Sequence, residues 1–138
     1  MAFLSTYIAF PGNAKEAFEY YHQVFGGDLT IITYGDMANM EGAPAVGNPN
    51  YVAHAQLDIP GGAITGSDGD RSSKEEYPLT GTAYSLLYCP NSIAKAKDLI
   101  AQLVEDGGKE QRPFQPAPWG SHYGQIFDKF GVMWAFNV

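Results

Sequence analysis

The side chains best suited to bind or transform a small molecule are histidine, glutamine and large aromatic residues in two stretches of the chain. His54 precedes Gln56 in a segment of alternating polarity, and His122 stands next to Tyr123. Imidazole, amide and phenol groups exchange hydrogen bonds with ligands, imidazole also binds divalent metal ions, and aromatic rings offer flat apolar surface. The candidate ligand-binding residues are His54, Gln56, Tyr84, Trp119, His122 and Tyr123.

Each candidate also has a structural explanation. His54 alternates with Val52, Gln56 and Asp58 on one strand face, which suits a wet cavity and a hydrogen-bonded structural histidine about equally well. His122 lies in a loop, where contact with a ligand and simple exposure are both open. Any single aromatic residue is more often a core or subunit contact than part of a pocket.

Motifs for several reaction classes are absent from the sequence. It contains no Gly-x-Ser-x-Gly elbow, and Cys89 has no histidine in its own or the matching element. Gly61-Gly62 lies inside a hairpin and not between a strand and a helix, so it is not a phosphate loop. Asp68-Gly69-Asp70 lacks the later ligands of a calcium loop and is interpreted as a turn. A Gly-rich signature for an adenosyl cofactor is also missing, and no cofactor is expected.

The composition of the chain indicates which partners and which cellular compartment to expect. The formal charge of −7 over 138 residues argues against a nucleic-acid partner, because phosphate backbones attract basic surfaces. A single cysteine, Cys89, is typical of a reducing compartment and is predicted to be a small core residue late in a strand. No stretch approaches the roughly 20 apolar residues of a membrane span. We therefore expect a soluble, cytoplasmic protein without membrane association.

The first half of the chain contains the elements that must position these residues. Residues 3–10 are predicted to form a strand, and Asn13 with Glu16 has the spacing of a capping box for the helix that follows. A second strand spans 28–34, an ordered loop 35–50, and a hairpin 51–67. The helix ends at Gly26-Gly27, and its apolar stripe is Ala14, Ala17, Phe18, Tyr21, Val24 and Phe25.

The second half repeats this order after a polar linker, residues 68–81. A strand at 82–89 leads to a helix capped by Asn91 or Ser92, and a hairpin lies near the end of the chain. The helix stripe is Ile93, Ala96, Ile100, Leu103 and Val104, which match first-half stripe residues at one offset of 79 positions. Two stripes in register indicate an internal duplication. The prediction is an α+β fold with tandem β-α-β-β-β modules, residues 1–67 and 82–138, that form a curled mixed sheet within one domain.

Several short motifs support a family assignment for this duplicated plan. The chain resembles the PhnB-like proteins of the vicinal oxygen chelate superfamily, which includes glyoxalase I, bleomycin-binding proteins and extradiol dioxygenases. The resemblance covers nearly the whole chain and lies in these motifs: Phe10-Pro11-Gly12-Asn13-Ala14, Tyr20-Tyr21, Val24-Phe25-Gly26-Gly27, Tyr34-Gly35-Asp36, His54-Ala55-Gln56-Leu57, Trp119-Gly120, Tyr123-Gly124, Asp128, Phe130-Gly131 and Trp134.

The resemblance implies where a metal site would lie. Active members of the superfamily place metal ligands on the first and last strands of each module, facing a cup in the sheet. The flanking motifs put the outer two positions at Thr6 and Ala135. The inner two fall near Thr65 or Gly66 and near Tyr84 or Ser85. These residues are poor ligands for a divalent ion, so no superfamily-type metal site is expected.

The sequence is compatible with two hypotheses for function. The first is a protein that binds a small organic molecule in the cup without turning it over. The second is a metal-dependent enzyme of the glyoxalase or dioxygenase type, with a non-standard ligand set that includes His54 and Gln56. In either case the exposed sheet edges and the family resemblance favour a homodimer.

Overall fold

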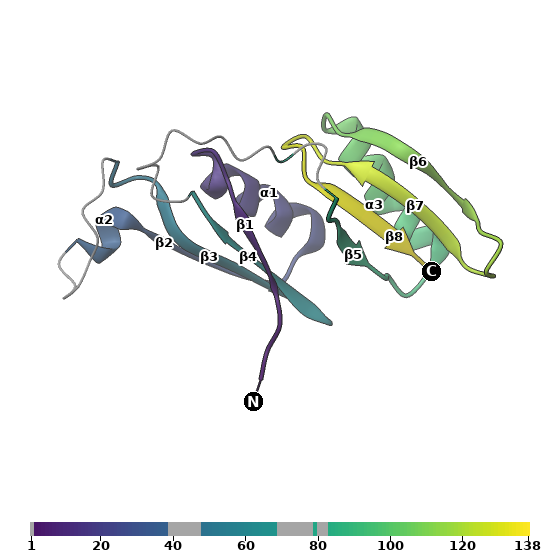
Figure 1. The fold of residues 1–138 in the computed structure, drawn as a ribbon, viewed down its shortest axis with the longest axis horizontal. Helices are drawn as coiled ribbons and strands as arrows, with labels where there is room; N and C mark the ends of the chain where they lie inside the picture. Colours follow the sequence, from purple (N-terminus) through teal and green to yellow (C-terminus); the bar gives the residue numbers. More distant parts are fainter. Residues whose placement is uncertain (1, 39–47, 69–78, 80–82) are drawn as a thin grey trace. The chain divides into compact units, whose positions relative to one another are not determined.

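Each half of the chain folds into a four-stranded mixed sheet with one long helix against it (Figure 1). The computed structural model describes residues 2–38, 48–68, 79 and 83–138. Residues 1–77 and residues 78–138 form two units, called the first unit and the second unit below. The predicted α+β fold with two β-α-β-β-β modules is confirmed.

The first unit has the sheet order β1-β4-β3-β2, in which β1 and β4 are parallel and the other neighbours are antiparallel. The predicted loop at 35–50 begins with a helical turn, and its residues 39–47 lie outside the described part of the chain. The elements are β1 (Thr6–Ala9), α1 (Ala14–Phe25), β2 (Asp28–Thr33), α2 (Tyr34–Met37), β3 (Val52–Ile59) and β4 (Gly62–Ser67).

A capping box forms the short helix α2, which the sequence did not indicate. The Thr33 hydroxyl accepts a hydrogen bond from the Asp36 backbone N–H at 3.1 Å, and the Asp36 carboxylate accepts one from the Thr33 backbone N–H at 2.9 Å. The backbone N–H of Thr33, and after it the Thr33 side chain, stabilise the Asp36 carboxylate and lower its pKa below the usual value. The bonds satisfy donors that a single turn of helix leaves without an internal partner.

The second unit repeats the topology with the order β5-β8-β7-β6, in which β5 and β8 are parallel. Its first strand is shorter than the predicted segment 82–89. The elements are β5 (Leu86–Tyr88), α3 (Ile93–Glu105), β6 (Lys109–Pro116), β7 (His122–Phe127) and β8 (Met133–Asn137).

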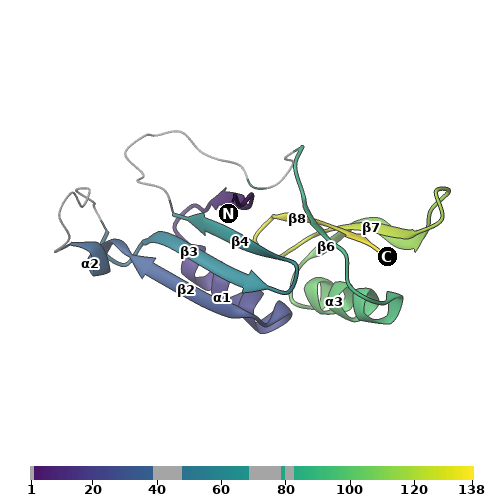
Figure 2. The same cartoon turned by 90° about the horizontal axis from the view of Figure 1, so that it is seen from below.

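Each long helix covers one face of its own sheet (Figures 1 and 2). In α1 the predicted stripe is buried, except that Phe25 is half-buried at the helix end. In α3 the stripe is displaced, because Leu99 is buried whereas the predicted Ile93 and Val104 are 36% and 39% exposed. Ser92, one of the two predicted caps, accepts a hydrogen bond from the Lys95 backbone N–H and begins α3.

The start of α1 is held by a residue from the far end of the first unit. Asn13 makes no capping hydrogen bond with its side chain, so the predicted capping box is wrong. Asp68, only 2% exposed, accepts bonds from the backbone N–H groups of Gly12 and Ala14 with Oδ1 and from that of Val52 with Oδ2. A buried carboxylate therefore joins α1, β3 and the end of β4. Asp68 is part of the folded unit, although the sequence places it in the linker.

Cys89 is exposed, which corrects the prediction of a core residue. The chain leaves β5 after Tyr88 and buries Pro90 instead, so Cys89 faces outward at the strand end. Within the described residues, no helix has the length and apolar character needed to cross a lipid bilayer.

Candidate functional site

The face of the first sheet opposite α1 carries most of the polar groups that could contact a ligand. The pairing register places Tyr7 beside Thr65, Thr65 beside Gln56, and Gln56 beside Thr30. Ile64, Ala55 and Leu57 alternate with these positions and are buried on the α1 side. We call this surface face A and define it as Tyr7, Thr30, His54, Gln56, Thr65 and Ser67.

A stacked pair of rings, Tyr7 on β1 and His54 on β3, is the main feature of face A. Their centroids are 5.9 Å apart with an interplanar angle of 25°. The Tyr7 hydroxyl lies 3.5 Å from His54 Nδ1, at the limit of a hydrogen bond. Since β4 runs between these strands, the Tyr7 ring reaches across the small side chains of Thr65 and Ser67. With 57% of its surface exposed, Tyr7 also offers stacking surface to a ligand.

Hydrogen bonds orient the polar neighbours of this pair. Gln56 donates from Nε2 to Asp58 Oδ1 at 2.8 Å, which directs its amide along the strand. Thr65 donates from its hydroxyl to the Thr6 carbonyl oxygen, so its oxygen can still accept a hydrogen bond. Face A thus combines an aromatic ring, an imidazole and oriented acceptors.

The strand-face prediction for β3 needs one correction. His54 and Gln56 lie on face A as predicted, but Val52 is fully buried. The register between β2 and β3 shifts at Ile32 and Thr33, where Ala53 is passed over, and this bulge turns Val52 into the core.

In the second unit the predicted site residues separate. Tyr123 and Gln125 point away from α3, on the same face as Ala135, and Gln125 Nε2 donates to the Tyr123 hydroxyl at 3.1 Å. Trp119, 62% exposed, packs edge-on against Tyr123 with a centroid separation of 5.8 Å. We call this surface face B and define it as Leu87, Trp119, Tyr123, Gln125 and Ala135.

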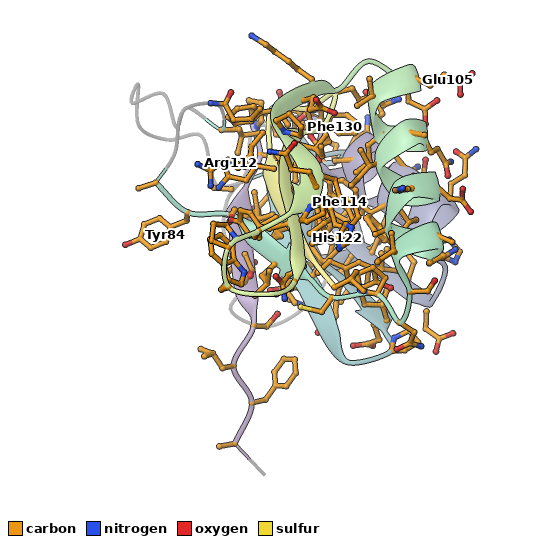
Figure 3. All side chains as sticks on the ribbon, turned by 90° about the vertical axis from the view of Figure 1, so that its right-hand side faces the viewer. Tyr84, Glu105, Arg112, Phe114, His122 and Phe130 are labelled. Carbon is orange, nitrogen blue, oxygen red and sulfur yellow. The ribbon has the colours of Figure 1, made fainter. Side chains whose placement is uncertain are left out.

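His122 and Tyr84 do not join face B. His122 alternates with Tyr123 along β7 and contacts Phe114 on the α3 side, with centroids 5.6 Å apart (Figure 3). Tyr84 precedes β5, is 84% exposed and extends away from the sheet (Figure 3). Within the units, the structure brings together His54 with Gln56 and Trp119 with Tyr123. Tyr7 was missed as a site residue because its contact with His54 depends on the pairing of β1 with β4.

Face A and face B also locate the positions at which the superfamily would hold a metal ion. Thr6 pairs with Ile64 on the α1 side, so the first-strand position is Tyr7 and not Thr6. Its partner is Thr65. In the second unit the corresponding pair is Leu87 and Ala135, so the inner position lies at Leu87 and not at Tyr84 or Ser85, which precede β5. Leu87 and Ala135 have hydrocarbon side chains without a ligand atom, and the donor set does not fit a divalent ion. In the described residues, no three His, Cys, Asp or Glu side chains lie close enough together to hold a metal ion.

Known proteins share this architecture along the entire chain. The chain is 30% identical to protein YjdN of Escherichia coli K12, over 98% of this chain and 94% of YjdN. The crystal structure of protein PA1353 from Pseudomonas aeruginosa is 32% identical, with a TM-score of 0.82 over 99% of this chain and 97% of that one. A PhnB protein from Bacillus cereus, described as a putative 3-demethylubiquinone-9 3-methyltransferase, has the same fold at 24% identity, with a TM-score of 0.70 over 96% of each chain.

The family model of the Glyoxalase/Bleomycin resistance protein/Dioxygenase superfamily matches residues 4–136. This range includes both long helices, faces A and B, and all strands apart from the last residue of β8. This match agrees with the motifs seen in the sequence and with the duplicated β-α-β-β-β topology. The chain belongs to the Glyoxalase/Bleomycin resistance protein/Dioxygenase superfamily.

Proposed function

We propose that the protein binds a small, partly aromatic organic molecule on face A, without a metal ion of the superfamily type. The observation that carries this proposal is the stacked pair of Tyr7 and His54 beside Gln56 and Thr65. A planar ligand would extend the stack on the exposed side of Tyr7. Its polar groups would meet the His54 imidazole and the Gln56 amide.

The chemistry of the matched positions favours binding over metal-assisted turnover. Leu87 and Ala135 supply no ligand atom, and Tyr7 and Thr65 supply hydroxyl groups that bind divalent ions weakly compared with imidazole or carboxylate. The side chains of face A therefore support recognition of an organic ligand.

A ligand-observed NMR screen of the protein after chelator treatment tests this proposal. The panel consists of phenols, benzamides and indoles, which present a flat ring with one or two polar groups. We expect hits whose affinity falls in the variants Tyr7→Ala and His54→Ala and is unchanged in His22→Ala. His22 is an exposed residue on α1 and serves as the matched control. Hits that bind equally to all three variants would contradict the assignment to face A.

Isothermal titration with nickel and zinc separates this proposal from the alternative of a metal-dependent enzyme. Weak binding, unaffected by His54→Ala, is expected if face A binds organic molecules alone. Tight one-to-one binding that is lost in His54→Ala would establish a non-standard metal site and overturn the metal-free proposal.

We also propose that the protein functions as a cytoplasmic homodimer. β1 and β5 each lie at the edge of a sheet, and the large apolar side chains of Phe3, Leu4 and Leu87 are more than half exposed in the single chain. Association of two copies would cover such surfaces. Light scattering during size-exclusion chromatography should give twice the 15.0 kDa mass of one chain, and a mass of one chain at micromolar concentration would refute the dimer.

A further inference from the structure

A depression at one end of the second sheet combines aromatic and basic side chains. It has a volume of about 600 Å³ and lies where the loop after α3 meets the turn between β7 and β8. Phe127 and Phe130 supply aromatic surface, and Lys109, Lys129 and Gln111 line the same depression. None of these residues belongs to face A.

The turn that carries two of these residues is held in place by Asp128. Its Oδ1 accepts hydrogen bonds from the backbone N–H groups of Phe130 and Val132, at 2.9 and 3.1 Å, and its Oδ2 accepts one from Trp134 Nε1 at 2.9 Å. Asp128 is 4% exposed, so its carboxylate is turned into the protein and compensated by three donors. These bonds therefore hold the backbone of the turn from which the side chains of Lys129 and Phe130 extend.

The two lysines reach the depression from separate elements. Lys109 begins β6 and pairs with Phe127, which places both on the side of the sheet away from α3. Lys129 Nζ lies 5.3 Å from the centroid of the Phe130 ring, within the range of a cation–π contact. Glu110, the acidic neighbour of Lys109, pairs with Ile126 and faces the α3 side instead. The depression thus has the Lys129 ammonium over an aromatic ring, and Lys109 is a second basic residue in its lining.

The two units differ in net charge, and the depression lies in the less acidic one. Residues 1–77 contain ten Asp and Glu against three Lys and Arg, whereas residues 78–138 contain five of each. The whole net charge of −7 therefore belongs to the first unit, and the second unit is neutral. An anion is repelled less by the second unit, and two of its five basic residues line this depression.

We propose that this depression is a second binding site, specific for small aromatic carboxylates. The ligand ring lies against Phe127 and Phe130, and the carboxylate accepts hydrogen bonds from the ammonium groups of Lys109 and Lys129. The Gln111 amide adds a further donor at the rim. This site is separate from face A and does not depend on the ligand proposed there.

Titration with benzoate, followed by two-dimensional amide NMR, tests the site. Benzyl alcohol carries the ring without the charge, acetate the charge without the ring, and benzylamine the opposite charge. We expect benzoate to shift the amides of residues 107–111 and 127–131, to bind roughly fivefold tighter than benzyl alcohol, and to weaken as salt is added. Equal affinity for benzoate and benzylamine, or shifts confined to other residues, would overturn the proposal.

Variants that replace a lysine with glutamine test whether the two lysines of the depression bind the carboxylate. Lys109→Gln and Lys129→Gln should each reduce benzoate affinity about two- to fivefold and remove its advantage over benzyl alcohol. Lys95→Gln removes the same charge from exposed α3 and should leave both affinities unchanged. An equal loss in Lys95→Gln would show that only the general charge of the unit matters and would refute a defined site. The His54 signals report on face A, so failure here is distinguishable from failure of the proposed function.

Discussion

The two units share one topology but differ in what their sheets present opposite the helix. Both have the same strand order, and both bury a stripe of their long helix against the sheet. Face A presents a stacked Tyr7–His54 pair with polar neighbours, whereas face B presents Leu87 and Ala135 beside the Trp119–Tyr123 pair. The first unit holds the entire net charge and the second is neutral. Duplication thus preserved the packed positions and left the opposite faces free to diverge.

Each unit also uses one buried aspartate, but for a different purpose. Asp68 joins the start of α1 to β3 in the first unit, while Asp128 closes the β7–β8 turn in the second. Both carboxylates accept three hydrogen bonds from their own unit. A buried carboxylate that accepts three hydrogen bonds therefore stabilises a helix start in one unit and a hairpin in the other.

The largest expected effect is on stability, and it tests the equivalence of the two aspartates. Asp68→Ala and Asp128→Ala should each lower the free energy of unfolding by about 3–5 kcal/mol, because three buried donors lose their acceptor. The exposed Asp58→Ala should change it by less than about 0.5 kcal/mol. Urea denaturation measures all three. A loss below about 1 kcal/mol for Asp68→Ala would show that another residue caps α1.

A designed metal site tests which residues of β1 lie on face A. Tyr7→His with Thr65→His puts two imidazoles side by side on paired strands, and we expect nickel affinity to rise by about tenfold. The control pairs Thr6→His with Thr65→His, which points the two imidazoles to opposite sides of the sheet and should give no gain. Calorimetric titration compares them. A gain in the Thr6 variant alone would show that the faces are assigned the wrong way round.

The smallest expected effect distinguishes face A from face B as the ligand site. Tyr7→Ala should weaken binding of an aromatic ligand from the screen about two- to tenfold, in line with the loss of one ring contact. Tyr123→Ala removes a ring from face B and should leave that affinity unchanged. Fluorescence or NMR titration of both variants decides the matter, and a larger loss in Tyr123→Ala would move the site to the second unit.

The sequence predicted the features that depend on local periodicity. The α1 stripe, the Gly26 helix end and the duplicated topology follow from spacing along the chain and were found. The α3 stripe was found in part, because Leu99 is buried in place of Ile93 and Val104. Ser92 was one of two predicted caps for α3, and it was accessible to prediction because its partner Lys95 is only three residues away. All the residues that produce such a signal lie close together in the sequence.

Features that depend on distant strands could not be predicted in the same way. The carboxylate of Asp68, 54 residues after Ala14 in the sequence, takes the place of the predicted Asn13 cap. Asp68 reaches the start of α1 only because β4 brings it there. The bulge opposite Ile32 buries Val52, and the pairing of β1 with β4 decides that Tyr7, and not Thr6, shares a face with His54. Likewise, His122 and Tyr123 point to opposite faces because they are consecutive residues of β7. The sequence predicted a loop at this position, and a loop does not imply that alternation.

Imidazole NMR of the three histidines tests the central claim most directly. The protein, labelled at histidine and freed of metal with chelator, is titrated with an aromatic ligand from the screen. We predict that the ring signals of His54 shift in proportion to occupancy, while those of His22 on α1 and His122 beside Phe114 stay in place. Shifts at His122 with His54 unchanged, or binding that requires added nickel or zinc, would contradict a metal-free ligand site on face A.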